Sequence, residues 1–194
     1  MGIALAQDST QDGAAISLPI HERTRERRLL RRAKGGDRES INELVGEHWD
    51  NAYRAALLIS RDHQAAEDIA QESFIAALES LRRFDRRRPF RPWLHRIVTN
   101  KAIDHHRSLA RRGEMLMKVP SSPDRASSGE DIPAELVEAL DRLEIEDRAI
   151  VVLRHLLDYR SEEIGAILNL PAGTVRGRLS RALSTMRIEL EEEL

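Results

Sequence analysis

The sequence predicts an all-α protein with two small helical domains joined by a flexible linker. Apolar residues recur at helical spacing along most of the 194 residues, and aromatic residues make up only 4% of them. Ala, Leu, Ile, Arg and Glu dominate, a composition that favours helices over strands. A stretch rich in Pro, Ser and Gly, 113–133, separates two helical segments and has the composition of a linker.

The first domain is expected over residues 25–112, after an aperiodic extension, 1–24, for which we expect disorder. Asp37 can cap the second helix of this domain. Four helices are expected, with approximate ranges 22–34, 37–60, 63–83 and 92–111. In the third of them, Ile69, Phe74, Ile75, Leu78 and Leu81 are expected to form the buried stripe.

The second domain is expected over residues 134–194, with a helix-turn-helix unit near its end. Its helices are expected at about 134–143, 146–157, 161–168 and 172–190. Ser161 is expected to cap the third helix, with two glutamates in the first turn. Asn169 lies where that helix must end, and Asn tolerates the left-handed conformation that such an end often uses.

The last helix has two different faces. Its apolar face is expected to be buried, and the other face bears arginine, glycine and serine but no acid. The apolar positions are Val175, Leu179, Leu183, Met186 and Leu190, and the polar ones are Arg176, Gly177, Ser180, Arg181 and Ser184. Arginine can contact phosphate or read guanine in the major groove, so this face predicts DNA binding. The alternative is a basic amphipathic helix that only packs on its neighbour.

Charge is strongly segregated although the net charge is only −2. Residues 62–80 hold five acids and no Lys or Arg, whereas residues 81–112 hold eleven Lys or Arg against two Asp, a net of +9. Adjacent acidic and basic blocks suggest two partners of opposite character. Within the acidic block, Asp68, Gln71 and Glu72 share one helical face, which would suit a basic protein surface.

The basic block contains a loop, FDRRRPFRPW, that interleaves aromatic residues with arginines. Guanidinium groups can hold a phosphate backbone while aromatic walls accept an unstacked base. The loop residues are Phe84, Arg86, Arg87, Arg88, Phe90, Arg91 and Trp93, and the helix that follows presents Asn100, Lys101, Asp104 and Arg107. The alternative is that Phe84 and Trp93 are core aromatics and that the arginines alone meet the nucleic acid.

Two blocks of sequence carry a family resemblance. AEDIAQESFIAALESLRRFDRRRPFRPWLHRIVTNKAIDHHR resembles region 2 of the extracytoplasmic-function (ECF) sigma factors of bacterial RNA polymerase, and YRSEEIGAILNLPAGTVRGRLSRALSTMR resembles their region 4. The resemblance implies that the chain binds core polymerase, reads the −10 and −35 promoter elements, and helps to open DNA without being an enzyme. It also implies an anti-sigma partner. A cytoplasmic location is expected on other grounds, because the sequence shows neither a membrane span nor a secretory signal.

The resemblance also implies residue roles. Asp68, Gln71 and Glu72 match positions that dock on the polymerase β′ clamp, while region 4 would dock on the β flap. The loop Phe84–Pro92, aided by Asn100, matches the part that melts the −10 element and captures a flipped base. The −35 positions fall on Thr174, Arg176, Gly177, Arg178, Ser180 and Arg181. Gly177 departs from the family, in which a small hydroxyl residue is common, so −35 specificity would rest more on Arg176 and Arg181. The basic segment Arg23–Arg32 fits no motif.

Parts of the sequence are also compatible with two other functions. An enzyme or metal site could be suggested by His95, His105, His106 and Asp104, but adjacent histidines point in different directions on a helix, and the chain has no Cys. No catalytic residue, metal or cofactor is therefore expected, nor is a signal peptide or membrane insertion. A stand-alone helix-turn-helix regulator would need a sensory pocket or a dimer helix in residues 25–112. The charged blocks there favour a polymerase partner.

Overall fold

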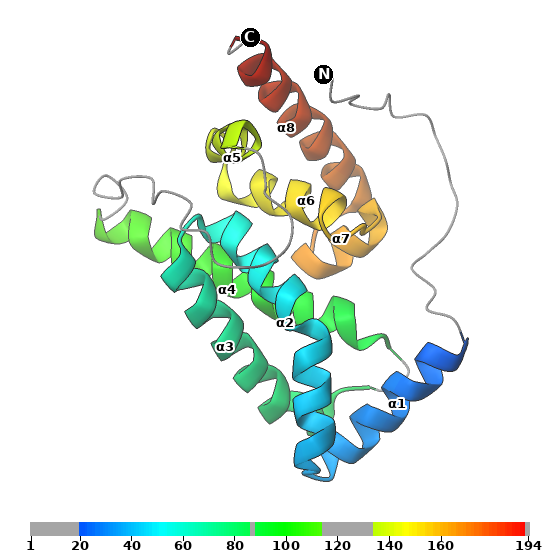
Figure 1. The fold of residues 1–194 in the computed structure, drawn as a ribbon. Coiled ribbons are helices and arrows are strands. Elements are labelled where there is room, and N and C mark those ends of the chain that lie inside the picture. Colours follow the sequence, from blue (N-terminus) through cyan, green and yellow to red (C-terminus); the bar gives the residue numbers. More distant parts are fainter. Residues whose placement is uncertain (1–19, 86–87, 114–133, 193–194) are drawn as a thin grey trace.

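The computed structural model describes residues 20–85, 88–113 and 134–192. Over these residues the chain forms eight α-helices and one short 3₁₀ turn, η1, and no strand (Figure 1). The elements are α1 (Ile20–Lys34), α2 (Arg38–Ser60), α3 (His63–Ser80), η1 (Leu81–Arg83), α4 (Phe90–Arg112), α5 (Ala134–Asp141), α6 (Ile145–His155), α7 (Ser161–Leu168) and α8 (Ala172–Glu192). The expected all-α fold is confirmed, while residues 1–19 and most of the expected linker lie outside the described residues.

Local capping explains where the helices of the first domain begin and end. The Asp37 carboxylate accepts a hydrogen bond from the Ser40 amide at 3.0 Å, as predicted, and Asp62 caps α3 in the same way. Arg61 adopts φ 60° and donates its amide to Leu57, which ends α2. α4 begins at Phe90, two residues earlier than expected, because a proline at position 92 is tolerated in the first turn of a helix.

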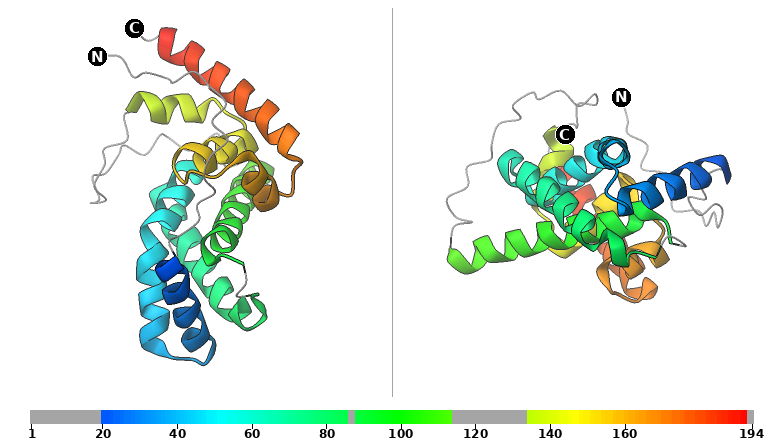
Figure 2. Two further views of the ribbon diagram at one scale, coloured as in Figure 1. Left: turned by 90° about the vertical axis from the view of Figure 1, so that its right-hand side faces the viewer. Right: turned by 90° about the horizontal axis from the view of Figure 1, so that it is seen from below.

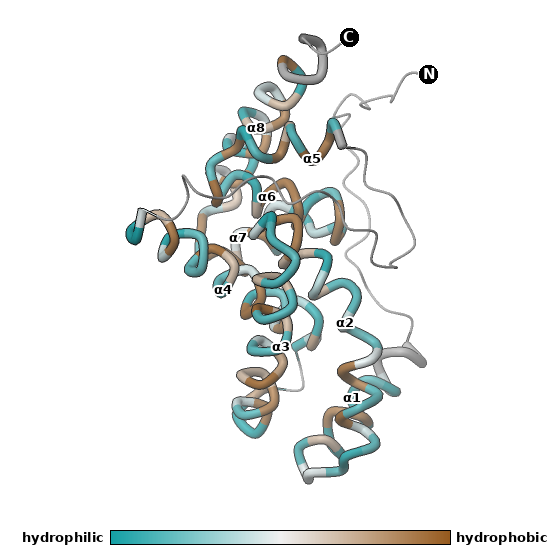
Figure 3. Tube along the Cα trace, turned by 60° about the vertical axis from the view of Figure 1, so that its left-hand side comes forward, coloured by the Kyte–Doolittle hydropathy of each residue, from teal (hydrophilic) through white to brown (hydrophobic). Residues whose placement is uncertain are grey.

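The first domain is a bundle in which α2, α3 and α4 pack on one another and α1 lies against α2 (Figures 1 and 2). Its core includes Leu30, Ile59, Phe74, Leu94 and Val98, each at most 5% exposed. The hydropathy colouring in Figure 3 shows hydrophilic residues over much of α1, with hydrophobic stretches between them. Leu29 and Leu30 of this helix are buried. The helix is therefore docked by a narrow apolar stripe and leaves most of its arginines in water.

The helix-turn-helix of the second domain is formed by α7 and α8. The prediction of Ser161 as N-cap is wrong: the cap is Arg160, whose amide donates to the carboxylate of Glu163 at 2.9 Å. Asn169 ends α7 at φ 58°, which confirms the left-handed stop. Gly165 was not singled out in the sequence, yet a Cβ there would lie 2.5 Å from the Leu170 carbonyl oxygen, so the tight turn requires glycine.

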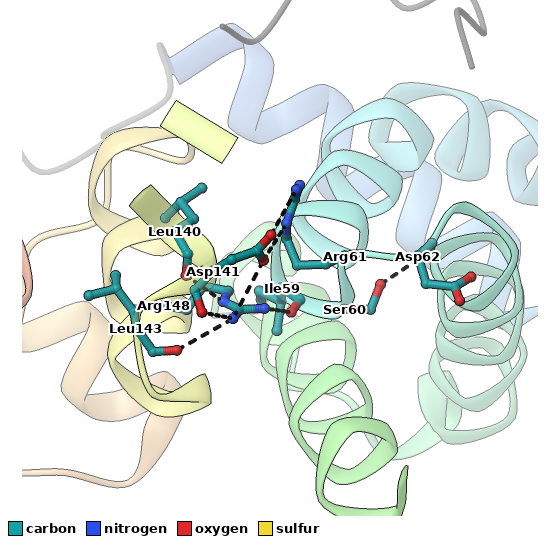
Figure 4. Close-up of polar contacts among 8 residues, drawn as sticks. All are labelled: Ile59, Ser60, Arg61, Asp62, Leu140, Asp141, Leu143 and Arg148. Carbon is teal, nitrogen blue, oxygen red and sulfur yellow. Dashed lines mark hydrogen bonds and ion pairs between the residues drawn. The ribbon is translucent and has the colours of Figure 1, made fainter. Parts of the chain in front are cut away.

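The two domains are packed together, with α6 against α2 and α4, and α7 against α4. Arg148 of α6 lies in this contact and is 5% exposed. Its guanidinium donates to the carbonyl of Ile59 in the first domain at 3.1 Å and to that of Leu140 in its own domain at 2.9 Å. Figure 4 shows this side chain among backbone carbonyls from both domains, beside the ion pair of Arg61 with Asp141. One hydrophobic core consequently runs through both domains.

Candidate polymerase and nucleic-acid interface

The predicted polymerase surface lies on α3. Asp68, Gln71 and Glu72 are all exposed on the same side of this helix, as their spacing predicted. The negative charge of Glu72 is partly neutralised by Lys101 of α4, which forms an ion pair with it at 2.8 Å. Lys101, expected to face DNA, therefore lies beside the acidic face, and the two predicted surfaces meet between α3 and α4.

An apolar residue joins this acidic face. Ile75 was expected in the buried stripe, but that prediction is wrong, since Ile75 is 57% exposed. It follows Asp68 by seven residues and Glu72 by three, so it extends the same face by one turn. In a contact with a protein surface, burial of such an aliphatic side chain would supply affinity, and the neighbouring charges would supply orientation.

The aromatic residues of the basic loop lie in the core. Phe84 is 6% exposed and Phe90 is 1% exposed, and their rings meet edge to face at 5.9 Å between centroids. Trp93 is half-buried and packs on Phe84 at 4.5 Å. The alternative prediction, in which Phe84 and Trp93 are core aromatics, thus agrees with the positions of these residues in the structure. Arg88 is exposed, whereas Arg86 and Arg87 lie outside the described residues.

Two of the other predicted DNA-binding arginines contact the second domain. Arg91 donates to the Leu157 carbonyl at 3.2 Å, and its guanidinium lies 5.6 Å from the centroid of the Tyr159 ring. Arg107 forms an ion pair with Glu146 at 2.6 Å. Asn100 and Asp104 remain exposed on α4. In this arrangement, Arg91 and Arg107 are therefore engaged within the protein.

The predicted −35 face of α8 is open to solvent. Thr174, Arg176, Gly177, Ser180 and Arg181 are exposed, while Val175, Ala182 and Met186 face the core. Arg176 forms an exposed ion pair with Glu162 at 3.2 Å, which contributes only about 0–1 kcal/mol and can exchange for a DNA contact. Arg178 is half-buried and lies 3.5 Å from Asp147 of α6.

A buried polar pair joins the domains next to these surfaces. His95 of α4 has its Nδ1 2.7 Å from the hydroxyl of Tyr159, and both side chains are at most 1% exposed. Burial lowers the pKa of His95 to about 3, with a further contribution from Arg91, and burial raises the pKa of Tyr159. Neither residue was expected to join the domains, because their 64-residue separation leaves no local sequence signal. His95 therefore serves as a neutral interface residue.

Within the described residues, the histidine-rich part of α4 does not form a metal-binding cluster. Among the described residues, no three His, Cys, Asp or Glu side chains lie where they could hold a metal ion together. His105 and His106 are both half-buried, and burial lowers the pKa of His106. Within the described ranges, no helix has the length and apolar character that a membrane span requires.

Comparison with known proteins assigns both domains to one family. A model of Sigma-70 region 2 matches residues 44–112, and a model of Sigma-70 region 4 matches residues 134–186. The ECF RNA polymerase sigma factor SigE of Mycolicibacterium smegmatis is 38% identical over 76% of this chain and 60% of its own length. RNA polymerase sigma factor NccH of Alcaligenes xylosoxydans xylosoxydans is 31% identical over 84% of this chain and 93% of its own length.

The structure gives the same assignment. The structure of CnrH in complex with the cytosolic domain of CnrY superimposes with a TM-score of 0.68 at 27% identity, covering 87% of this chain and 99% of CnrH. Both domains and their order are thus shared with sigma factors of known structure and sequence. The ECF RNA polymerase sigma factor SigM of Mycobacterium tuberculosis is 32% identical over 84% of this chain and 82% of its own length. The chain belongs to the ECF family of RNA polymerase sigma factors.

Proposed function

We propose that this sigma factor binds core RNA polymerase through α3, reads promoter DNA through α4 and α8, and helps to open the −10 region. The observation that carries the proposal is the separation of two exposed surfaces: an acidic and apolar face on α3, and an arginine-bearing, acid-free face on α8. The first suits a basic protein surface and the second suits the major groove.

On the first domain, the acidic face is Asp68, Gln71 and Glu72, extended by Ile75. We assign it to the β′ clamp, with Ile75 supplying the apolar part of the contact. The −10 surface is assigned to Arg88, Asn100 and Asp104 on and beside α4, together with Arg86 and Arg87 of the loop. Phe84 and Phe90 hold the base of that loop in the core, and Arg91 and Arg107 can join the DNA surface once they leave the second domain.

On the second domain, the −35 surface is assigned to Thr174, Arg176, Gly177, Ser180 and Arg181, with Arg178 near a phosphate. Glycine at 177 has no side chain to donate a hydrogen bond, so base discrimination rests on the two exposed arginines. The mechanism is binding and strand separation; catalysis belongs to the polymerase, and the chain acts in the cytoplasm where that polymerase works. CnrH, in the related structure, is bound to CnrY, and we propose that an anti-sigma protein likewise binds this chain.

The direct test is co-elution of the purified chain with bacterial core RNA polymerase on size-exclusion chromatography. The wild type should bind stoichiometrically, and Asp68→Arg/Glu72→Lys should weaken binding at least tenfold, because it reverses two exposed charges on the contact face. Glu39→Lys/Asp50→Arg is the matched control: it reverses two exposed acidic residues on α2, outside the predicted contact face, and should bind like the wild type.

Two results would contradict the proposal. If the folded wild type fails to bind polymerase but binds duplex DNA alone as a dimer, the chain is a stand-alone regulator. If both double variants bind equally well, the clamp contact does not lie on α3.

A further inference from the structure

The basic helix α1 lies directly beside the segment that enters α4. Lys34, near its end, donates to the carbonyl of Phe84 at 2.5 Å. Glu26, two turns earlier, accepts a hydrogen bond from the amide of Phe90 at 3.3 Å. α1 is therefore tied at two points to the ends of the basic loop.

The two flanks of α1 differ in how their charge is compensated. On the flank toward α2, Arg25 forms ion pairs with Glu43 and Glu47, and Arg32 pairs with Asp37 and Glu39. Arg27 and Arg31 lie on the other flank. Arg27 follows Glu26 by one position, and Arg31 follows Leu30 by one position. Because one position is a rotation of about 100°, both arginines point to the side of the docked face. Both arginines are exposed, and neither has a hydrogen-bond or ion-pair partner within the described residues.

The uncompensated flank is continuous with charge on the neighbouring elements. η1 packs against α1 and contributes Arg82 and Arg83, and the segment before α4 contributes Arg88. All three are exposed and have no side-chain ion-pair partner among the described residues, and Asp85 is the one acid between positions 81 and 91. We call Arg27, Arg31, Arg82, Arg83 and Arg88 the cationic rim.

Like charges on neighbouring elements repel one another, so exposed arginines on α1, η1 and the segment before α4 raise the free energy of the protein alone. The cost is offset when a polyanion binds, because phosphates neutralise the arginines and release counterions. On the flank of α1 toward α2, each of the paired arginines, Arg25 and Arg32, meets two acids. On the rim, by contrast, none of the five arginines has a side-chain ion-pair partner among the described residues, and the rim borders the loop assigned above to −10 opening.

We propose that the cationic rim binds the phosphate backbone of promoter DNA adjoining the opened segment, so that α1 forms part of the DNA-binding surface. This inference rests on the proposed sigma function and extends it to a helix that no sequence motif explains. The rim positions the DNA and adds affinity that does not depend on base sequence, because arginines on phosphates carry no base information.

The test is equilibrium binding of holoenzyme, core polymerase plus the full chain, to a labelled promoter over a range of KCl concentrations. Arg27→Gln/Arg31→Gln should weaken binding roughly tenfold and reduce the slope of log K against log[KCl] by about 1.4 to 1.8, since each lost phosphate contact contributes about 0.7 to 0.9. Arg27→Lys/Arg31→Lys keeps the charge and should retain the slope.

The matched control is Arg25→Gln/Arg32→Gln, which removes the same charge from the same helix on the flank facing α2. It should bind within twofold of the wild type, and circular dichroism checks that both variants fold. Wild-type affinity and slope in the rim variant would overturn the inference, as would an equal loss in the control, which would indicate a general charge effect. A rim variant that loses core polymerase instead of DNA would assign the rim to a protein contact.

The proposed function has a separate readout in the same experiment. If wild-type holoenzyme forms and binds the promoter while the rim variant matches it, only the inference about α1 fails. If wild-type chain gives core polymerase no promoter affinity, the sigma function fails and the inference with it.

Discussion

Arginine residues in this protein act in opposite ways depending on what surrounds each guanidinium. Arg148 is buried and donates to several backbone carbonyls, so its burial is compensated by hydrogen bonds from both domains. Burial still lowers its pKa, while Asp141 acts in the opposite direction. Arg176 is exposed on α8 and held only by a surface ion pair. The first is a structural residue and the second is available to a ligand.

We expect Arg176→Ala to impair −35 recognition without changing stability. If Arg176 reads a guanine through two hydrogen bonds, the loss should be about 1–3 kcal/mol and should relax discrimination at that base pair. The measurement is holoenzyme binding to promoters with matched and single-substituted −35 sequences. Arg187→Ala, which removes an exposed arginine farther along α8, should keep wild-type discrimination. Unchanged discrimination in Arg176→Ala would remove this residue from the reading set.

At the scale of one element, α4 combines three roles along 23 residues. Its buried face carries Leu94, Val98 and Ala102 into the bundle core, while His95 faces the second domain. Its exposed face carries Asn100 and Asp104, which we assign to DNA. Because successive helical residues point about 100° apart, one helix can supply a core, a domain contact and a ligand surface.

The neutral histidines on α2 and α4 should make stability fall in mild acid. Burial lowers the pKa of His95 to about 3 and that of His48 to about 4, both below the ordinary value of 6.5. The unfolded chain therefore takes up these protons below about pH 6.5 while the folded chain does not. The free energy of unfolding should be greatest above pH 6.5 and fall as pH decreases, by up to about 1.4 kcal/mol per pH unit for each histidine.

Urea unfolding at several pH values between 7.5 and 5 measures this effect, in a range above the ordinary titration of carboxylates. Burial also lowers the pKa of His106 and that of His155, so both residues act in the same direction. A free energy of unfolding that stays constant across this range would show that the histidines are not held neutral in the folded protein.

At the scale of the whole molecule, the two domains are joined by contacts of unequal strength. The contact between His95 and Tyr159 is buried, whereas the ion pairs Arg107 with Glu146 and Arg61 with Asp141 lie nearer the surface. A buried hydrogen bond left half-made costs more than a surface ion pair, because the remaining partner loses its water. The buried pair should therefore contribute more to the association of the domains than either surface ion pair does.

We expect Tyr159→Phe to weaken the domain contact by about 1–3 kcal/mol, since it leaves the His95 Nδ1 without its partner. Because the chain contains no Cys, single cysteines introduced at Asp50 and Arg187 can carry a fluorophore pair that reports domain separation by energy transfer. Arg107→Ala, which removes one exposed pair, should shift the separation much less. A larger opening in Arg107→Ala than in Tyr159→Phe would reverse the ranking of these contacts.

Local chemistry by itself determined most helices, the left-handed stop at Asn169 and the exposed positions Asp68, Glu72 and Arg176. Helical periodicity and capping act over a few residues, so the sequence contains all the information that they need. The N-cap of α7 was the local exception, because the Glu163 carboxylate meets the Arg160 amide in place of a serine hydroxyl.

Only the tertiary structure decided which candidate residues are free to bind. It buried Phe84 and Phe90, exposed Ile75, placed Lys101 on Glu72, and directed Arg91 to the second domain. These outcomes depend on packing between residues far apart in the chain, and an apolar or basic residue at helical spacing looks the same whether its face meets a neighbour or water. The same packing joined His95 to Tyr159 across 64 residues and set the arginines of α1 beside the loop, because contacts of this kind exist only once the helices have assembled.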